Sequence, residues 1–346
     1  MSFKASSCPS RLSGPATIAL AGILSSAVIG SGPAGYGQSS SAAPGSIPAD
    51  RVVATVDGDE IKAGEIESSL TAALAGRTVS NEMLPTLRAE VLAQLIDQRL
   101  VEEALGKNYR ASAEEVDKSI AESSEQLEAA GSSFKEFLAD RRLDMPTFRR
   151  QRAWQLSWQR YVGDRLTDQL LKSYFASHKR EFDGTQLRVR HILLQLEGGD
   201  PKETARLLGE AKGLREQIET GKLTFAKAAE LHSAGPSRYA GGDLGFIPRR
   251  GVMVEPFAKA AFSLRKGQVS EPVVTTFGVH LIEVSEEKPG ERDWTDVREL
   301  LIPPASDALF ARLAAEGRKK AKIAFTGAMP YFHPGTRELI ANAAGN

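Results

Sequence analysis

Residues 188–196 read RVRHILLQL, and residues 277–284 read FGVHLIEV. Both are short apolar runs rich in branched residues, which is typical of β-strands. Each run carries one histidine, His191 and His280, although the whole chain holds only five. A single histidine in a strand is more often a hydrogen-bonded core residue than a catalyst. The residues between the two runs therefore decide how the pair is to be interpreted.

Between these strands the sequence predicts three helices and a further strand. Pro201 can begin a helix whose apolar residues recur at spacings of three and four, and Thr224 can cap a second, shorter helix. The loop SAGPSRYAGGDLGF at 233–246 leads into a short strand. Glu255 and Pro256 then open a third helix. The expected order is β-α-α-β-α-β-β, which describes a compact α+β domain.

The segment before this domain is predicted to be mainly helical. RVVATVDGDEI at 51–61 indicates a strand, a turn and a returning strand. Helical signals then continue to about residue 180. Ser112 with Glu115, and Ser133 with Glu136, each have the spacing of a capping box and so mark two helix starts.

The segment after the domain is expected to return to the helical region. Thr295 can cap a helix that Pro303 and Pro304 are expected to break, with a further helix over roughly 305–320. AKIAFTG at 321–327 then indicates a strand. A lone strand needs a partner, and the strand that begins at residue 51 is the unpaired candidate. We therefore predict that the two chain ends pair and that the α+β domain is inserted between them.

The N-terminus has the order of a secretory signal. Lys4 and Arg11 precede the apolar run GPATIALAGILSSAVIG at 14–30, and small residues follow it. The alternative is a membrane anchor, but this run is shorter than the ~20 apolar residues of a spanning helix. Cleavage is expected near Gly37. Cys8, the single cysteine, would be removed with the signal, and no cysteine follows the apolar run to carry a lipid.

Composition and motifs exclude several kinds of chemistry. Lys and Arg together equal Asp and Glu in number, so the net charge of zero gives no case for a nucleic-acid partner. The sequence contains neither a His-Glu-x-x-His nor a Gly-x-Ser-x-Gly motif. Two histidines alone make a poor zinc site, since such sites have three or four protein ligands. We expect no metal and no cofactor.

Five motifs occur in a fixed order along this region. They are VRHILL, FAKAAELHS, GGDLGFI, MVEPFAKAAFSLRKGQVSEPV and TTFGVHLIEV. Together they resemble the parvulin family of peptidyl-prolyl cis-trans isomerases. The preceding LTDQLLKSYFASHKREFD and the helical flanks resemble exported foldases of the SurA and PrsA type, so the resemblance covers most of residues 50–326. It implies a parvulin (FKBP-like) domain inserted in a mainly helical chaperone domain built from both chain ends.

The resemblance also implies the site. By position, His191 and His280 match the two catalytic histidines, whose rings hydrogen-bond as a pair on the floor of the parvulin cleft. The positions that match the substrate-binding wall are Leu244, Met253, Phe257 and Phe277. Without the order of the motifs, Met253 and Phe257 would be interpreted as ordinary core residues.

One position departs from the family pattern. Active parvulins usually carry Asp or Cys in the loop before the GGDLG motif, where this chain has Ala234 and Gly235. Neither Ser233 nor Ser237 is expected to replace that group. Asp243 is expected to order the glycine turn rather than to take part in catalysis.

Three hypotheses of function follow. The first is an exported isomerase and folding chaperone of the periplasm or cell envelope of a bacterium, acting on unfolded polypeptides that contain Xaa-Pro bonds. The second is a chaperone whose parvulin domain binds peptides with little or no isomerase activity, which Ala234 and Gly235 favour. The third, weaker hypothesis is a membrane-tethered version with an uncleaved anchor. No particular client or oligomeric state follows from the sequence.

The expected domain limits cover the whole chain. They are 1–37 for the signal peptide, 38–50 for a linker, 51–183 for the N-terminal helical domain, 184–288 for the parvulin domain, 289–326 for C-terminal helices and a strand that pack on the N-terminal domain, and 327–346 for a flexible tail.

Overall fold

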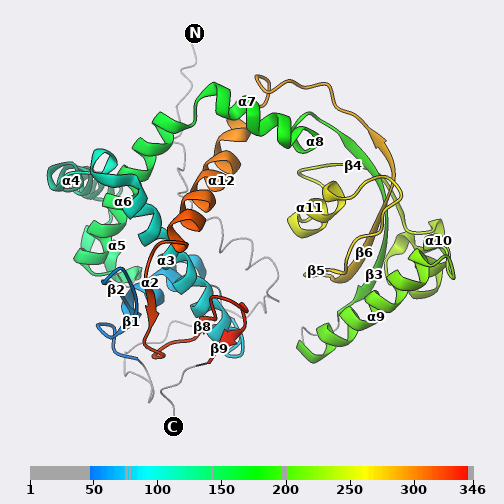
Figure 1. Ribbon diagram of the computed structural model, residues 1–346, viewed down its shortest axis with the longest axis horizontal. Coiled ribbons are helices and arrows are strands. Elements are labelled where there is room, and N and C mark those ends of the chain that lie inside the picture. Colours follow the sequence, from blue (N-terminus) through cyan, green and yellow to red (C-terminus); the bar gives the residue numbers. More distant parts are fainter. Residues whose placement is uncertain (1–46, 75–76, 78, 142, 197–200, 342–346) are drawn as a thin grey trace. The chain divides into compact units, whose positions relative to one another are not determined.

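The computed structural model describes residues 47–341, apart from 75–76, 78, 142 and 197–200 (Figure 1). The expected signal peptide and the cleavage near Gly37 lie outside the described residues. No helix in the described part is long and apolar enough to cross a bilayer. The chain divides into two compact units. One contains the described residues up to Asp164 and from Asp307 onward, and the other contains Arg165–Ser306.

The first unit joins the two ends of the chain in one small sheet. Its strands are β1 (Val52–Val56), β2 (Asp59–Lys62) and β7 (Ile323–Phe325), in the order β2-β1-β7. β1 and β7 are antiparallel, with Ala54 opposite Phe325. The predicted pairing of the chain ends is therefore confirmed.

Helices make up most of this unit. They are α2 (Ala63–Leu74), α3 (Leu84–Tyr109), α4 (Ala113–Ala129), α5 (Phe134–Asp140) and α6 (Met145–Arg165). Both predicted capping boxes are present, Ser112 with Glu115 at the start of α4 and Ser133 with Glu136 at the start of α5. In each box the serine hydroxyl accepts from the backbone N–H three residues on, and the glutamate accepts from the serine N–H. Local sequence thus fixes where these two helices begin.

Replacing Ser112 by alanine should lower the free energy of unfolding by about 1 kcal/mol, because the N–H of Glu115 loses its acceptor. Urea unfolding followed by circular dichroism measures this loss. Ser112→Asp keeps an acceptor oxygen at the cap and is the matched control, with stability close to that of the unchanged protein. Equal losses in both variants would contradict a capping role.

The predicted break at Pro303 and Pro304 is wrong. A single helix, α12 (Arg298–Arg318), contains both prolines. Leu301 and Ala305 on either side of them are almost fully buried, in a cluster with Leu171 of α7. Glu299 and Leu300, whose carbonyls lose their helical N–H donors to the two prolines, are exposed, so these carbonyls can bond to water. Burial of the flanking residues offsets the lost helical hydrogen bonds.

The flexible tail expected at 327–346 is wrong for its described part, residues 327–341. Ala328 and Met329 are each only 3% exposed. β8 (Tyr331–Phe332) and β9 (Leu339–Ile340) form a small antiparallel hairpin. The ring of Tyr331 stacks on Phe325 of β7, with 4.1 Å between ring centroids. The tail is therefore anchored to the sheet through an aromatic pair.

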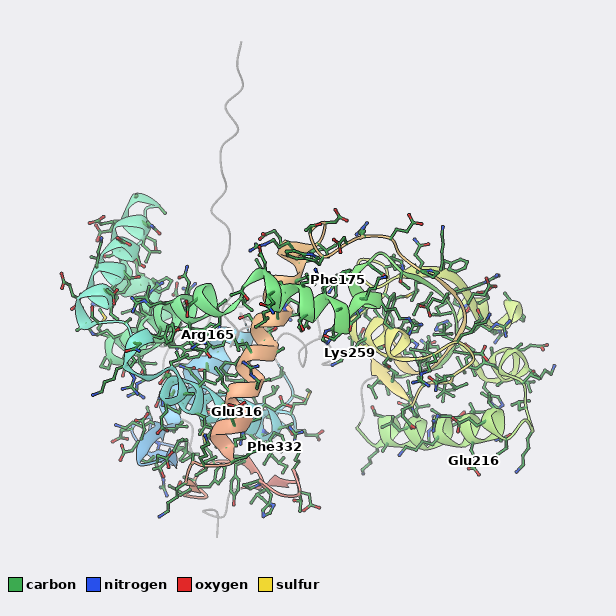
Figure 2. All side chains as sticks on the ribbon, turned by 45° about the horizontal axis from the view of Figure 1, so that its top comes forward. Arg165, Phe175, Glu216, Lys259, Glu316 and Phe332 are labelled. Carbon is green, nitrogen blue, oxygen red and sulfur yellow. The ribbon has the colours of Figure 1, made fainter. Side chains whose placement is uncertain are left out.

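The second unit contains the α+β domain and the helices that precede it. Its elements are α7 (Asp168–Ser177), α8 (Lys179–Phe182), β3 (Gln186–Gln195), α9 (Pro201–Glu219), α10 (Phe225–His232), the 3-10 helix η1 (Pro236–Ala240), β4 (Asp243–Pro248), α11 (Glu255–Ser263), β5 (Val273–Thr275) and β6 (Gly278–Lys288). From β3 onward this is the predicted order. Phe175 of α7, labelled in Figure 2, packs in a cluster with Phe182 and with Val297.

The sheet of this unit is antiparallel, in the order β4-β3-β6-β5. Helices cover both of its faces (Figure 1). On one face Ile192 and Leu194 of β3 pack in a cluster with residues of α9 and α10. On the other face Leu187 and Val189 pack in a cluster with Phe257 of α11. The candidate site lies on the α11 face.

Candidate functional site

Neighbouring strands bring His191 and His280 together. β3 and β6 are paired so that His191 lies opposite Ile282 and His280 lies opposite Leu193. The two Nδ1 atoms are 3.4 Å apart, and the ring planes differ by 24°. Both residues are buried, with 8% and 4% of their surface exposed. The predicted histidine pair is therefore present, as a direct contact between two buried imidazoles.

A threonine that the sequence reasoning missed completes the pair. Thr275 Oγ1 lies 2.8 Å from Nε2 of His280, and it accepts the backbone N–H of Phe277 at 3.1 Å. At the other end of the pair, Nε2 of His191 is buried and has no hydrogen-bond partner among the described residues. The sequence did contain a hint of this role, since Thr275 is the first residue of the motif that contains His280. Only the turn between β5 and β6 shows that its hydroxyl reaches the ring.

Burial keeps both rings uncharged. Burial, with a smaller contribution from the nearby His191, lowers the pKa of His280 to about 4. Burial also lowers the pKa of His191. An imidazolium loses its hydration on burial, and no carboxylate among the residues that the structure describes is paired with either ring to compensate for this loss. Near pH 7 both rings are therefore neutral, and each has one donor and one acceptor nitrogen.

Phe257 forms the apolar wall beside the histidines. Its ring meets His280 edge-on, with centroids 5.4 Å apart, and meets His191 at 6.0 Å. It is only 2% exposed, and Leu244 and Met253 pack as partly buried residues against the same cluster. Phe277, at the turn before β6, is 59% exposed. Leu244, Met253 and Phe257, three of the predicted substrate-binding residues, thus lie together beside the two rings, and the fourth, Phe277, is linked to them through Thr275.

The loop before β4 lies against the edge of the His191 ring that carries Nε2. The Ala234 N–H donates to the Leu193 carbonyl at 2.8 Å. Ser233 Oγ accepts the N–H groups of Leu193 and Gly235, so this hydroxyl orders the backbone. A Cβ atom added to Gly235 would lie 3.0 Å from Nε2 of His191. The position where parvulins usually carry an acid or a cysteine is therefore next to the unpartnered nitrogen.

Asp243 has the predicted structural role. Its Oδ1 accepts the N–H of Gly245 at 3.0 Å, and its Oδ2 pairs with Arg188 at 2.8 Å. The hydrogen bond from Arg188 is the main cause of a lowered pKa at Asp243. The carboxylate therefore holds the glycine turn of β4 against β3.

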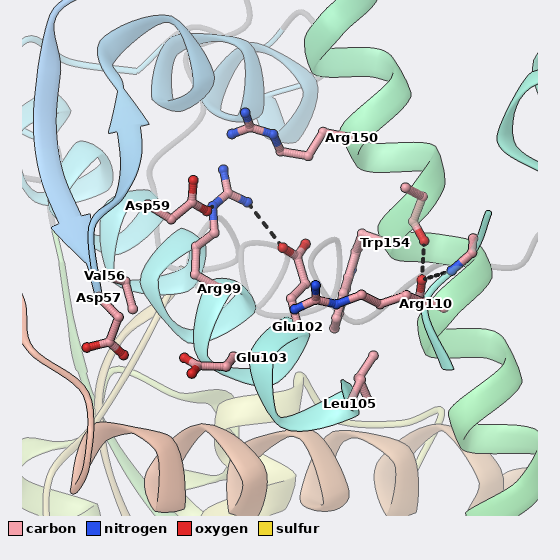
Figure 3. Close-up of a pocket in the computed structure, with 13 residues that line it drawn as sticks. Val56, Asp57, Asp59, Arg99, Glu102, Glu103, Leu105, Arg110, Arg150 and Trp154 are labelled. Atoms are coloured by element: carbon pink, nitrogen blue, oxygen red, sulfur yellow. Dashed lines mark hydrogen bonds and ion pairs between the residues drawn. The ribbon is translucent and has the colours of Figure 1, made fainter. Parts of the chain in front are cut away.

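The first unit contains a concave region, with a volume of about 520 Å³, that sequence reasoning did not find (Figure 3). Arg99 of α3 lies at its centre and is almost fully buried. Its guanidinium is 2.7 Å from Glu65, 2.9 Å from Asp59 and 3.7 Å from Glu102. Burial is the main cause of a raised pKa at Glu102. The cavity is thus lined by an ion-pair network that holds α3 to the β1–β2 hairpin and α2.

Comparison with known proteins identifies relatives for both parts of the chain. The family model of the PPIC-type PPIase domain matches residues 191–286, and that of the SurA-like N-terminal domain matches residues 11–162. The foldase protein PrsA of Bacillus subtilis is 28% identical over 216 residues, 62% of this chain and 66% of its own. The chaperone SurA of Alcanivorax borkumensis is 29% identical over 288 residues, 78% of this chain and 64% of its own.

The chain therefore spans slightly less than two thirds of the length of each of these two relatives. Among solved structures, PrsA of Bacillus anthracis matches 66% of this chain and 96% of its own, with 24% identity and a TM-score of 0.36.

Proposed function

Since the chain carries a PPIC-type PPIase domain together with a SurA-like N-terminal domain, we propose that it is a peptidyl-prolyl cis-trans isomerase and folding chaperone. Its substrates are unfolded or extended exported polypeptides that contain Xaa-Pro bonds. The chain itself is exported to the periplasm or cell envelope of a bacterium, as the signal-like N-terminus predicts. The histidine pair and the apolar wall of Phe257 support the isomerase part of this proposal most directly.

The reaction requires no covalent chemistry. Rotation about a peptide bond has a barrier of ~18–20 kcal/mol, and uncatalysed prolyl isomerisation takes tens to hundreds of seconds. The barrier comes from the loss of resonance between the nitrogen and the carbonyl group. A cleft that removes water from the carbonyl and holds the proline ring weakens this resonance. Binding groups, with neither a metal nor a nucleophile, are sufficient for such catalysis.

The arrangement on the α11 face fits this requirement. The partly buried Leu244 and Met253 and the exposed Phe277 offer apolar surface for the proline ring beside the buried ring of Phe257, and Met253 can adapt its shape to different neighbouring side chains. The two imidazoles form the polar end of the same cleft and are neutral because both pKa values are lowered. His191 and His280 are proposed as catalytic residues, and Leu244, Met253, Phe257 and Phe277 as residues that contact the substrate.

The test is a prolyl isomerisation assay on short Xaa-Pro peptides. Met253→Ala should lower kcat/KM about tenfold, because it removes apolar contact with the proline ring. Met253 is only partly buried, so the variant should remain folded. Leu231→Ala is the matched control, since Leu231 is an apolar residue of the same unit that is 60% exposed and lies on α10. Its activity should equal that of the unchanged protein.

The same assay separates the isomerase from the peptide-binding chaperone. Aggregation of an unfolded client is measured in parallel, by light scattering. If the unchanged protein suppresses aggregation but does not accelerate isomerisation, the isomerase proposal fails and the binding-only function stands. Equal activity in Met253→Ala and Leu231→Ala would show that this cleft is not the isomerase site.

A further inference from the structure

Met253 lies on a loop that the hydrophobic core does not hold by itself. The loop comprises residues 250–254, between β4 and α11. Met253 is only partly buried, and its neighbours Val252 and Val254 are 61% and 40% exposed. Phe257, by contrast, is 2% exposed, so core packing fixes its position. Contacts other than apolar burial are therefore needed to hold Met253 in place.

An ion pair joins the two ends of this loop. Arg249, which precedes the loop, donates two hydrogen bonds to Glu255, which follows it, at 2.6 and 2.8 Å. Nε of Arg249 also donates to Glu181 of α8 at 3.1 Å. The Arg249 side chain is only 9% exposed, and the hydrogen bond to Glu255 is the main cause of its raised pKa. A planar guanidinium that binds two carboxylates at once fixes the ends of the loop in both distance and direction.

Helix α8 also contacts the far end of α11 (Figure 1). Nη1 of Arg180 donates to the carbonyls of Phe262, at 3.1 Å, and of Leu264, where α11 ends. Carbonyls at a helix C-terminus have no donor within their own helix, so this arginine supplies one. Arg250 of the loop donates to the Glu181 carbonyl at 3.0 Å. The short helix α8 therefore holds α11 at both ends.

We propose that Arg249 is a positioning residue of the isomerase. Through Glu255 it holds Met253 at the substrate-binding cleft, and through Glu181 it makes this arrangement depend on α8. This inference rests on the proposed isomerase function. α8 lies before residues 191–286, which are the part that matches the PPIC-type PPIase domain. The cleft of this chain is therefore supported from outside the matched domain.

A loop that is already held binds substrate at lower cost than a loop that must first be ordered. Without Arg249 the ends of loop 250–254 can separate, and only a fraction of the molecules present Met253 correctly at any moment. The apparent affinity falls in proportion to that fraction. The side chains of Glu181 and Glu255 are 33% and 63% exposed, so both carboxylates remain hydrated when Arg249 is replaced, and the protein should still fold.

A double-mutant cycle on kcat/KM for a short Xaa-Pro peptide tests the inference. Arg249→Leu should lower kcat/KM about tenfold, mainly by raising KM. In the Met253→Ala background the positioned side chain is already absent, so Arg249→Leu should lower kcat/KM by less than about twofold more. Glu181→Leu leaves the pair of Arg249 with Glu255 in place and should lower kcat/KM about threefold.

A second readout does not depend on activity. In protein labelled with ¹³C at the methionine methyl groups, Arg249→Leu should narrow the NMR signal of Met253 and move it towards the position of an unfolded methionine. Met253→Ala identifies that signal. Arg206→Leu is the matched control, because this arginine is 63% exposed and lies on α9, and it should change neither the signal nor kcat/KM. If Arg249→Leu does not fold, Arg249→Lys takes its place, since lysine keeps the charge but lacks the planar fork.

The outcomes keep this inference separate from the proposed function. If the unchanged protein does not accelerate isomerisation, the proposed function fails and takes the inference with it. If it does, the inference alone is overturned by an unchanged kcat/KM or an unchanged Met253 signal in Arg249→Leu. Losses that multiply to about a hundredfold in the double variant would overturn it as well, because Arg249 would then act independently of Met253. An unchanged kcat/KM in Glu181→Leu would overturn the dependence on α8.

Discussion

Replacing Arg99 by methionine is expected to lower the free energy of unfolding by about 3–5 kcal/mol, because it leaves a buried carboxylate without its partner. Arg99 Nη2 lies 2.7 Å from Oε2 of Glu65, whose side chain is only 11% exposed. Arg150 also pairs with this oxygen at 3.1 Å, but its side chain is 47% exposed and compensates less. Urea unfolding followed by tryptophan fluorescence reports on the change, because Trp154 lines the same cavity.

Two controls separate the buried charge from the loss of side-chain volume. The double variant Arg99→Met, Glu65→Leu removes both charges and should recover much of the lost stability. Arg88→Met breaks a pair with Glu67 in which the two side chains are 33% and 40% exposed, and it should cost under about 1 kcal/mol. A loss in Arg99→Met no larger than that in Arg88→Met would show that the network contributes little.

Acid should destabilise the protein between about pH 6.5 and pH 4 through His280. The pKa of this ring is about 4 in the folded protein, whereas that of an unfolded histidine is about 6.5. In this window the unfolded chain binds a proton that the folded chain does not, so stability falls as the pH falls. Above pH 6.5 the contribution is fully present. A shift of this size corresponds to about 3 kcal/mol, lost in full below pH 4.

The measurement compares the pH dependence of the free energy of unfolding in the unchanged protein and in His280→Gln. Carboxylates titrate in both proteins, so the difference between the two curves isolates the histidine. The unchanged protein should lose more stability between pH 6.5 and pH 4 than the variant does. Parallel curves would mean that His280 titrates alike in the folded and unfolded states.

Sequence patterns correctly predicted the elements whose limits depend on residues close together in the chain. The capping boxes of Ser112 and Ser133 satisfy backbone groups three residues away, so their outcome does not depend on tertiary structure. The order of strands and helices around His191 and His280 was also predictable, because apolar periodicity and turn residues mark each element. Resemblance to a family supplied the pairing of these two rings, which periodicity alone left open.

The features that the sequence did not predict depend on tertiary contacts. Pro303 and Pro304 break a helix by local rules, but burial of Leu301 and Ala305 holds α12 together around them. The ion pair of Arg99 with Glu65 joins residues of two different helices, and nothing in either local sequence indicates it. The unpartnered nitrogen of His191 is likewise visible only once the loop before β4 is placed against the ring.

The pairing of β1 with β7 sets an order of events during synthesis. A growing chain presents β1 before the inserted unit, but its neighbour in the sheet, Ile323–Phe325, is made only after that unit. Until then one edge of β1 is open, and closing so long a loop is entropically costly. The inserted unit is continuous from Arg165 to Ser306 and has all its strands by the time Lys288 is made. It can therefore fold while the first unit, whose two segments flank it in the sequence, still lacks β7.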